Sequence, residues 1–323
     1  MSVYLGIDVG SVSTNIVAMS EDDKILQKIY LRTKGQPIQT LLEGLKLIKE
    51  KLHNPEVKGV GTTGSGRQLA AVIIGGDVVK NEITAHAVAA AKMVPGVKTV
   101  IEIGGQDSKI IIMKNGIVND FAMNTVCAAG TGSFLDQQAS RLNIRIDDFG
   151  SIALKAKNPV RIAGRCTVFA ESDMIHKQQM GHSLEDILAG LCEALVRNYL
   201  SNLGKGKSLL EPVAFQGGVA ANIGIKHAFE KALSLNVIVP PNFDVMGAIG
   251  VAYLAKSAVQ NGKSKFKGFD ISEAQFQASS FECSNCSNAC EVVQIAKDKK
   301  IIARWGDRCG RWTALDKTDK MIG

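Results

Sequence analysis

The chain has 323 residues, enough for about two domains, and 46% of them are apolar, which is sufficient for substantial cores. Its net charge is +7, but Lys and Arg are scattered and no basic run alternates with aromatic residues, which argues against nucleic-acid binding. No stretch approaches the ~20 apolar residues of a membrane span, and Asp8 interrupts the apolar N-terminal stretch, unlike a secretory signal, so we expect a cytoplasmic protein.

Two segments share one plan of strands and turns. Residues 3–30 read as three strands with a Gly/Ser turn and an acidic turn between them, and residues 97–124 repeat that order. Asn115-Gly116 in the second copy is a strong hairpin signal. Helical patterns follow at 38–52 and at 133–142. The repeat predicts an α/β fold of two duplicated lobes that face each other across a cleft.

The turn after the first strand has the composition of a phosphate-binding loop. Its backbone amides from Val9 to Ser13 can wrap a phosphate, and its hydroxyl groups add donors. Asp8, at the end of the strand, is a candidate ligand of Mg²⁺, directly or through water. The candidate nucleotide contacts in this turn are Gly10, Ser11, Val12, Ser13 and Thr14.

The matching turn of the second copy supplies the opposite side of the predicted cleft. Gly104 and Gly105 allow close approach of the backbone to a phosphate. Gln106 and Asp107 would face the same phosphates and place a water molecule or the metal. Either turn alone fits an ordinary hairpin, but their equivalent positions in a repeat favour a catalytic role. Which of Asp8, Gln106 and Asp107 activates the water stays open.

Two further Gly-rich segments, 213–225 and 239–255, each join an apolar strand to a helical pattern. They are candidates for the flat, largely apolar walls that an adenine ring needs. The predicted contacts there are Gly217, Gly218, Asn222, Met246, Gly247 and Ile249. Gly130 and Gly132 are added from the Gly-rich segment that follows Cys127.

Cys127 and Cys166 each stand just before a helical pattern, in Gly-rich surroundings. A 4Fe–4S cluster usually takes four thiolates, so two copies of the chain would supply a full set. Helix N-termini carry partial positive charge and would face an anionic cluster. Ser133 with Asp136 fits a capping box for the first of these helices. The alternative for each cysteine is an inert core residue, which is our interpretation of Cys192.

Some conspicuous residues receive no function from the sequence. The histidines lack metal-binding spacing, so His86 and His176 are interpreted as packing or surface residues. The segments 62–67 and 81–87 are also left without a role.

A third cysteine group follows residue 258. Residues 260–270 are polar, with repeated Lys and Gly, and read as a linker. Cys283, Cys286, Cys290 and Cys309 then have the spacing of a zinc site or a second Fe–S site. A tail of low apolar content would need such a staple to fold. The alternative is free thiols in a flexible tail.

The segments 8–14, 103–109, 127–134, 164–174 and 215–222 together resemble the ATP-dependent activators of 2-hydroxyacyl-CoA dehydratases. That family includes the ATPase subunits of benzoyl-CoA reductases and the reductases of double-cubane-cluster proteins. It belongs to the superfamily of acetate and sugar kinases, heat-shock chaperones and actin, which is built from duplicated ribonuclease-H-like lobes. The likeness covers about residues 3–257.

The resemblance implies a homodimer with one 4Fe–4S cluster between the subunits, ligated by Cys127 and Cys166 of each. It also implies ATP and Mg²⁺ in the cleft, hydrolysis to ADP, and helices that reorient around the cluster. An upstream donor such as ferredoxin or flavodoxin would supply the electron. A 2-hydroxyacyl-CoA dehydratase or a double-cubane-cluster protein would accept it.

We therefore expect a first lobe at 1–95, a second lobe at 96–258 with the cluster cysteines and adenosine segments, and a linker with a cysteine-rich extension at 259–323. Two other functions stay open. A small-molecule kinase of the same superfamily would not need Cys127 or Cys166, and a nucleotide-sensing interaction module would not turn over ATP steadily.

Overall fold

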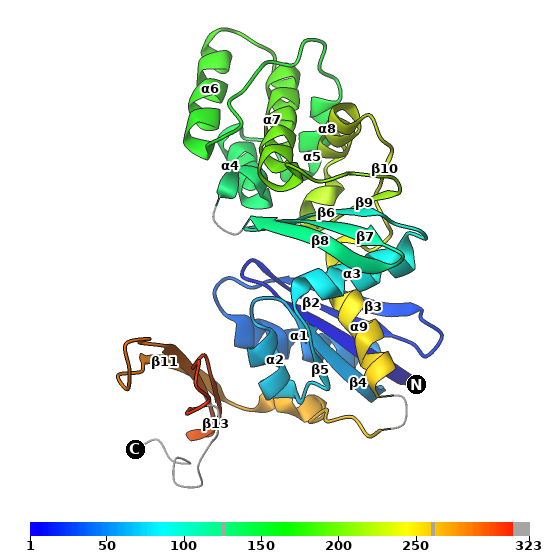
Figure 1. The fold of residues 1–323 in the computed structure, drawn as a ribbon, viewed down its shortest axis with the longest axis vertical. Coiled ribbons are helices and arrows are strands. Elements are labelled where there is room, and N and C mark those ends of the chain that lie inside the picture. The colour runs from blue at the N-terminus through cyan, green and yellow to red at the C-terminus, as the bar shows by residue number, and fades with distance from the viewer. Residues whose placement is uncertain (125–126, 260–261, 313–323) are drawn as a thin grey trace.

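A computed structural model describes residues 1–124, 127–259 and 262–312. Two five-stranded sheets dominate the fold, and each has the same strand order and directions (Figure 1). In each sheet three antiparallel strands form a meander, and two parallel strands extend the sheet from the first strand of the meander. The predicted duplication of an α/β unit is thereby confirmed.

Lobe 1 is the first sheet with the helices that cover it. The first two strands, residues 2–9 and 13–19, are mostly buried on both faces, whereas the third, residues 25–32, is largely exposed. Pro37 stands in the first turn of α1, where its fixed φ suits the helix. In chain order the elements are β1 (Ser2–Val9), β2 (Ser13–Met19), β3 (Ile25–Arg32), α1 (Pro37–Lys51), β4 (Glu56–Thr63), α2 (Arg67–Ile74), β5 (Val78–Val79) and α3 (Glu82–Met93).

Lobe 2 is the second sheet and a helical layer on its outer face. Asn115 and Gly116 have φ of 52° and 77°, which is the left-handed conformation that the predicted hairpin turn requires. The elements are β6 (Thr99–Ile103), β7 (Ser108–Lys114), β8 (Ile117–Asn124), α4 (Gly132–Arg141), α5 (Ile146–Ala153), α6 (Thr167–Gln179), α7 (Leu184–Tyr199), β9 (Val213–Gln216), α8 (Ile223–Leu233) and β10 (Val237–Ile238). Short single-turn helices lie at Ala128–Gly130 (η1), Leu200–Gly204 (η2), Gly218–Ala221 (η3) and Phe243–Val245 (η4).

Helix α9 (Met246–Ala258) leaves lobe 2 and packs on β1 and β4 of lobe 1, beside α3. With α3 it forms a middle layer between the two sheets (Figure 1). Glycines permit the close approach: a methyl group at Gly6 would overlap the Ala248 carbonyl oxygen, and one at Gly61 would overlap that of Val251. Residues 246–258, which the sequence groups with the second lobe, thus lie against the first.

The segment after residue 261, within the linker predicted at 260–270, packs on lobe 1; residues 260–261 lie outside the described parts. The Asp77 carboxylate accepts hydrogen bonds from the Ser264 hydroxyl and the Lys265 amide, both at 2.7 Å. Phe266 and Phe269 make an edge contact at 5.1 Å and join the core of lobe 1. Apolar residues spaced among the lysines explain this attachment.

The extension itself is a three-stranded antiparallel sheet at the far end of lobe 1 from lobe 2 (Figure 1). Val292 and Ile295 are fully buried in it, and Phe281 stacks edge-on against Trp312 at 4.9 Å. Its elements are η5 (Phe269–Glu273), β11 (Phe276–Glu282), β12 (Glu291–Lys297) and β13 (Lys300–Trp305). Among the described helices, none combines the length and the apolar character that crossing a bilayer requires.

Candidate active site

A cleft of about 550 Å³ lies between the two lobes. Both predicted phosphate turns and the predicted adenosine segments border it, so segments far apart in the chain meet there. Of the predicted contacts, those that line the cleft are Asp8, Gly10, Ser11, Val12, Ser13, Gly104, Gly105, Gln106, Asp107, Gly132, Gly217, Gly218, Asn222 and Gly247.

The first turn is closed by its own backbone, because the Gly10 amide donates to the Ser13 carbonyl at 2.9 Å. Thr14 differs from its prediction as a cleft donor. It is fully buried, with its hydroxyl oxygen 3.1 Å from that of Thr33. The Thr33 hydroxyl in turn donates to the Gly10 carbonyl at 3.0 Å. Thr14 therefore supports the turn from its buried side, and the neighbouring residues of the turn line the cleft.

The second turn faces the first across the cleft. The Gly104 amide donates to the Asp107 carbonyl at 3.0 Å, which mirrors the closure of the first turn. A methyl group at Gly105 would stand 2.7 Å from the Val12 side chain, so only glycine lets the two turns approach this closely. The backbone of both turns thereby meets at one place, as a shared phosphate site requires.

A buried lysine that the sequence analysis missed organises the carboxylates of lobe 2. Lys109 has only 3% of its side chain exposed, and its Nζ lies 3.0 Å from Glu102 Oε2 and 2.8 Å from Asp107 Oδ2. Burial raises the pKa of Glu102 to about 7, although the Lys109 ammonium opposes the shift. The two carboxylates in turn hold the pKa of Lys109 above its usual value, despite its burial. Lys109 is thus a fixed positive charge at the cleft floor.

Asp8 is the carboxylate of lobe 1 at the same floor. Desolvation raises its pKa to about 7; Lys109 opposes the shift, and the negative charges of Glu82 and Asp107 add to it. Gly64 and Gly247 enclose the carboxylate, because a methyl group on either would overlap one of its oxygens. A bound cation would relieve this unfavourable burial of negative charge.

Segments 62–67 and 81–87, which had no role from the sequence, also reach the cleft. Gly64 and Ser65 line it from the end of β4, and Glu82 and His86 line it from α3. His86 Nδ1 lies 2.8 Å from Gln216 Nε2 of lobe 2. Burial lowers the pKa of His86 to about 3, with a smaller contribution from the Lys109 ammonium, so the imidazole is neutral. The interpretation of His86 as a packing residue therefore misses its place at the cleft.

The predicted adenine walls are only partly where the sequence analysis places them. Met246 and Ile249 are 1% and 0% exposed and belong to the core between the sheets, because they face into the middle layer. The side chains of Phe243 and Ile146 line the cleft instead. Gly130 does not line it either; it packs against Asn198.

Two ion pairs join the lobes at the edge of the cleft. Lys28 of β3 lies 2.9 Å from Asp244 of η4. Arg32 of β3 lies 3.5 Å from Asp136 of α4, and both of these residues line the cleft. Both pairs are partly exposed, so we assign them a role in orienting the lobes and little stabilising energy.

Cys127 and Cys166 are both partly exposed, and a segment beside each of them lies against Asn198 of α7. Asn198 on α7 donates from Nδ2 to the Gly164 carbonyl at 2.6 Å, just before Cys166. A methyl group at Gly130, just after Cys127, would stand 3.0 Å from Asn198 Oδ1. Cys166 is the N-cap of α6, and Cys127 is the N-cap of the short helix η1. The two cysteine loops therefore share one support.

The start of α4 is bonded to the second phosphate turn. The Gly132 amide donates to the Gly104 carbonyl at 2.8 Å, and Ser133 donates to the Gly105 carbonyl from its amide at 2.9 Å and its hydroxyl at 2.5 Å. The predicted capping box of Ser133 and Asp136 is therefore wrong, because Thr131 is the N-cap and the Ser133 hydroxyl has a partner outside the helix. Hydrogen bonds link the turn to the segment that follows Cys127.

The four cysteines of the extension do not assemble a metal centre. Within residues 1–124, 127–259 and 262–312, no three His, Cys, Asp or Glu side chains are placed to hold a metal ion. Cys283 is 6% exposed, and its Sγ accepts hydrogen bonds from Trp312 Nε1 at 3.2 Å and from Asn285. Cys309, by contrast, is exposed. The extension is instead held together by the apolar core around Val292 and Ile295.

Residues 5–255 match the model of the BadF/BadG/BcrA/BcrD ATPase family. The chain belongs to this family. The match spans both lobes and α9, and the extension follows it.

Curated relatives agree with this assignment. The (R)-2-hydroxyglutaryl-CoA dehydratase activating ATPase of Acidaminococcus fermentans is 35% identical over 262 residues, which cover 79% of this chain and 98% of the relative. The 2-hydroxyisocaproyl-CoA dehydratase activator of Clostridioides difficile is 33% identical over 266 residues, which cover 81% and 98%.

Solved structures show the same fold. The activator of the 2-hydroxyisocaproyl-CoA dehydratase from Clostridium difficile, with bound ADPNP, matches with a TM-score of 0.75 and 31% identity, over 80% of this chain and 96% of that one. A ROK family glucokinase from Streptomyces griseus in complex with glucose and AMPPNP has a TM-score of 0.52 at 14% identity, over 79% and 99%, which shows a shared fold alone.

Proposed function

We propose that the protein is an ATPase that donates single electrons at low potential through a 4Fe–4S cluster shared by two copies of the chain. The observation that carries this proposal is the direct bonding of the second phosphate turn to the start of α4, just after Cys127. A nucleotide that moves this turn would move the cysteine loop with it. The activating functions in the names of the relatives support the proposal.

The cleft fits ATP with Mg²⁺. Asp8 is enclosed by glycines and lacks a cation partner of its own among the described side chains within hydrogen-bonding distance, so it is our candidate for holding Mg²⁺. The amides of the two turns would bind phosphate oxygens, and Lys109 adds a fixed positive charge. Asp107 and Gln106, on the opposite lobe, would orient the attacking water. The metal would neutralise charge that develops on the phosphates.

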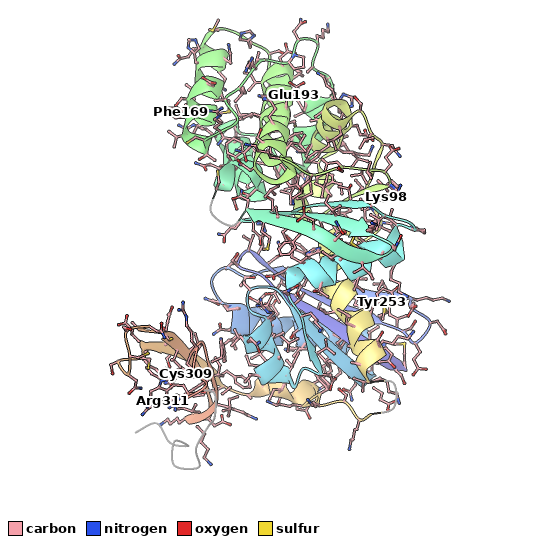
Figure 2. The ribbon with its side chains drawn as sticks, viewed as in Figure 1. Lys98, Phe169, Glu193, Tyr253, Cys309 and Arg311 are labelled. Atoms are coloured by element: carbon pink, nitrogen blue, oxygen red, sulfur yellow. The ribbon has the colours of Figure 1, made fainter. Side chains whose placement is uncertain are left out.

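The cysteines fit half of a cluster site. Each chain offers Cys127 and Cys166 on loops that Asn198 supports, and four thiolates complete a 4Fe–4S cluster. Beside Cys166, Val168 and Phe169 are 67% and 66% exposed, and Phe169 projects from the outer side of α6 (Figure 2). Apolar side chains of this size at the surface favour burial against a second copy. We therefore propose a homodimer joined at this face.

Hydrolysis would reach the cluster through α4. The two glycine carbonyls accept hydrogen bonds from the start of α4, and the amides of the turn other than that of Gly104 would bind phosphate. Loss of a phosphate would therefore shift α4 and the Cys127 loop together. Changes in hydrogen bonds and solvent exposure are among the factors that set cluster potentials over ~1 V. ATP drives such a shift only if it binds the two conformations with different affinity.

For the acceptor we propose a 2-hydroxyacyl-CoA dehydratase-type protein or a double-cubane-cluster protein. The relatives named above activate dehydratases, and a more distant relative, 28% identical, is one of the subunits of the benzoyl-CoA reductase of Thauera aromatica. A ferredoxin or flavodoxin is our candidate for the upstream donor.

The test is anaerobic purification followed by iron analysis, absorption near 400 nm and measurement of the solution mass. We expect about four iron atoms per dimer, and their loss in Cys127→Ser and in Cys166→Ser. Cys192→Ala is the matched control, because Cys192 is 2% exposed and lies in the core of lobe 2. An iron-free, monomeric wild-type protein would contradict the proposal. ATP-dependent phosphorylation of a small molecule that persists in Cys166→Ser would favour a kinase instead.

A further inference from the structure

We propose that Glu171 joins α6 to α4, so that the Cys166 loop follows any displacement of α4 that the nucleotide produces. This inference rests on the proposed function and deepens it, because it adds a path from the nucleotide to the second cysteine. Glu171 is a positioning residue, since it acts through the two helices that it connects.

The hydrogen bonds of the second phosphate turn reach the helix that follows Cys127, which is α4. Cys166 caps a different helix, α6, which starts at Thr167. The two helices occupy different places in lobe 2: α4 lies close to the sheet, and α6 lies farther out in the helical layer (Figure 1). A shift of α4 would therefore separate the two cysteine loops unless α6 moves with it.

The Glu171 carboxylate accepts hydrogen bonds from three side chains at the end of α4. Arg141 Nη1 lies 2.7 Å from Glu171 Oε1. On the other oxygen, Oε2, Nε2 of Gln137 lies at 3.4 Å and Nε2 of Gln138 at 3.3 Å. A single partly exposed ion pair would hold two helices only weakly. Here donors from one helix occupy both oxygens, so α4 fixes the position of the carboxylate.

Gln138 makes this junction depend on Glu171. Its side chain is 0% exposed, and Glu171 is its one hydrogen-bond partner in the described parts of the chain. A carboxylate only accepts, so the amide group presents its nitrogen to Glu171. Separation of the helices would leave this buried donor without a partner, which costs more free energy than the loss of an exposed hydrogen bond. The contact thus favours the arrangement in which α4 and α6 stay together.

Each of the two helices connects this junction to a cysteine loop. Helix α4 has ten residues and begins at the phosphate turn, so it spans about 15 Å as one rigid element. On α6, Asp173 Oδ2 accepts a hydrogen bond from the Ala163 amide at 2.8 Å, in the loop before Cys166. A displacement of the turn therefore reaches Cys166 through α4, Glu171 and α6.

Amide hydrogen exchange of the anaerobically purified protein tests this link, with Mg·ADP and with Mg·ADPNP. In the wild type we expect exchange in both 132–141 and 167–179 to differ between the two nucleotides. In Glu171→Leu the difference in 132–141 should remain, and the difference in 167–179 should be lost. The two nucleotides are compared within each variant, so a general loosening of α6 cancels.

Lys231→Leu is the matched control. It breaks another ion pair between neighbouring helices of lobe 2, that of Lys231 on α8 with Glu193 on α7 at 2.8 Å, and should preserve both differences. A difference in 167–179 that survives in Glu171→Leu, or that is missing in the wild type while 132–141 responds, would overturn the inference alone. A wild type in which 132–141 does not respond would contradict the proposed function as well.

Exchange of the two charges tests the ion pair itself. Arg141→Leu should reduce the difference in 167–179, as Glu171→Leu does. Arg141→Glu combined with Glu171→Arg restores opposite charges, and Gln138 can turn its oxygen toward the new guanidinium. The difference in 167–179 should therefore return in the double variant, although each of its single substitutions removes it. A double variant no better than its single substitutions would also overturn the inference.

Discussion

Glu102 offers a quantitative test of how the cleft floor is built. Its folded-state pKa of about 7 lies above its ordinary 4.5, mainly because it is buried, with 4% exposed. Between these values the folded protein keeps the proton and the unfolded chain loses it, so stability is highest below pH 4.5 and falls as the pH rises to 7. At about 1.4 kcal/mol per unit of pKa, the ionisation of this carboxyl alone lowers the free energy of unfolding by about 3.5 kcal/mol. Glu102→Gln should abolish that fall.

Urea unfolding of wild type and Glu102→Gln at pH 5 and pH 8, in chelator and without nucleotide, measures the effect. The free energy of unfolding of the variant relative to wild type should rise by about 3 kcal/mol between these pH values. Exposed Glu43→Gln controls for the loss of one negative charge. A difference for Glu102→Gln that does not change with pH, or that falls at pH 8, would refute the reasoning.

Three further predictions concern the turn, the floor and the extension. Ser133→Ala removes one hydrogen bond to the Gly105 carbonyl. ATP turnover should stay within about twofold, because one neutral hydrogen bond contributes only about 1 kcal/mol, whereas the number of electrons delivered per ATP should fall. Unchanged electron delivery would argue against coupling through α4. Gly247→Ala places a methyl group against Asp8 and should weaken Mg·ATP binding, measured by calorimetry, by at least tenfold. The overpacking should also lower the free energy of unfolding by about 1–3 kcal/mol. Tight binding would contradict the placement of Asp8. Trp312→Ala should cost the extension about 3–5 kcal/mol, seen as faster proteolysis of residues 276–305, with ATP turnover unchanged.

The sequence predicts well whatever depends on local chemistry. The two meanders coincide with the predicted segments 3–30 and 97–124 to within about two residues at each end, and the two phosphate turns meet across the cleft. Gly104 and Gly105 could be identified as cleft residues, because a turn that approaches another segment this closely leaves no room for a side chain. The repeated plan also predicts correctly that the two sheets are equivalent.

The sequence does not predict which side chains converge from distant segments. Met246 reads as a cleft residue from its neighbours, but the middle layer buries it. Lys109 and His86 were missed because their partners lie on other elements. One signal was available: Glu102 and Lys109 each interrupt an apolar strand, and a charge at such a position needs a partner.

The packing of α9 on β1 and β4 restricts how the two lobes can move relative to each other. Where this helix crosses β1 and β4, backbone rests on backbone at Gly6 and Gly61, so the helix cannot roll without breaking those contacts. Relative motion of the lobes is left to the short connections at 94–98 and 239–245, the two places where the chain passes between them. Two such hinges define a single axis. We therefore expect any opening of the cleft to be a rotation about the line that joins these two connections.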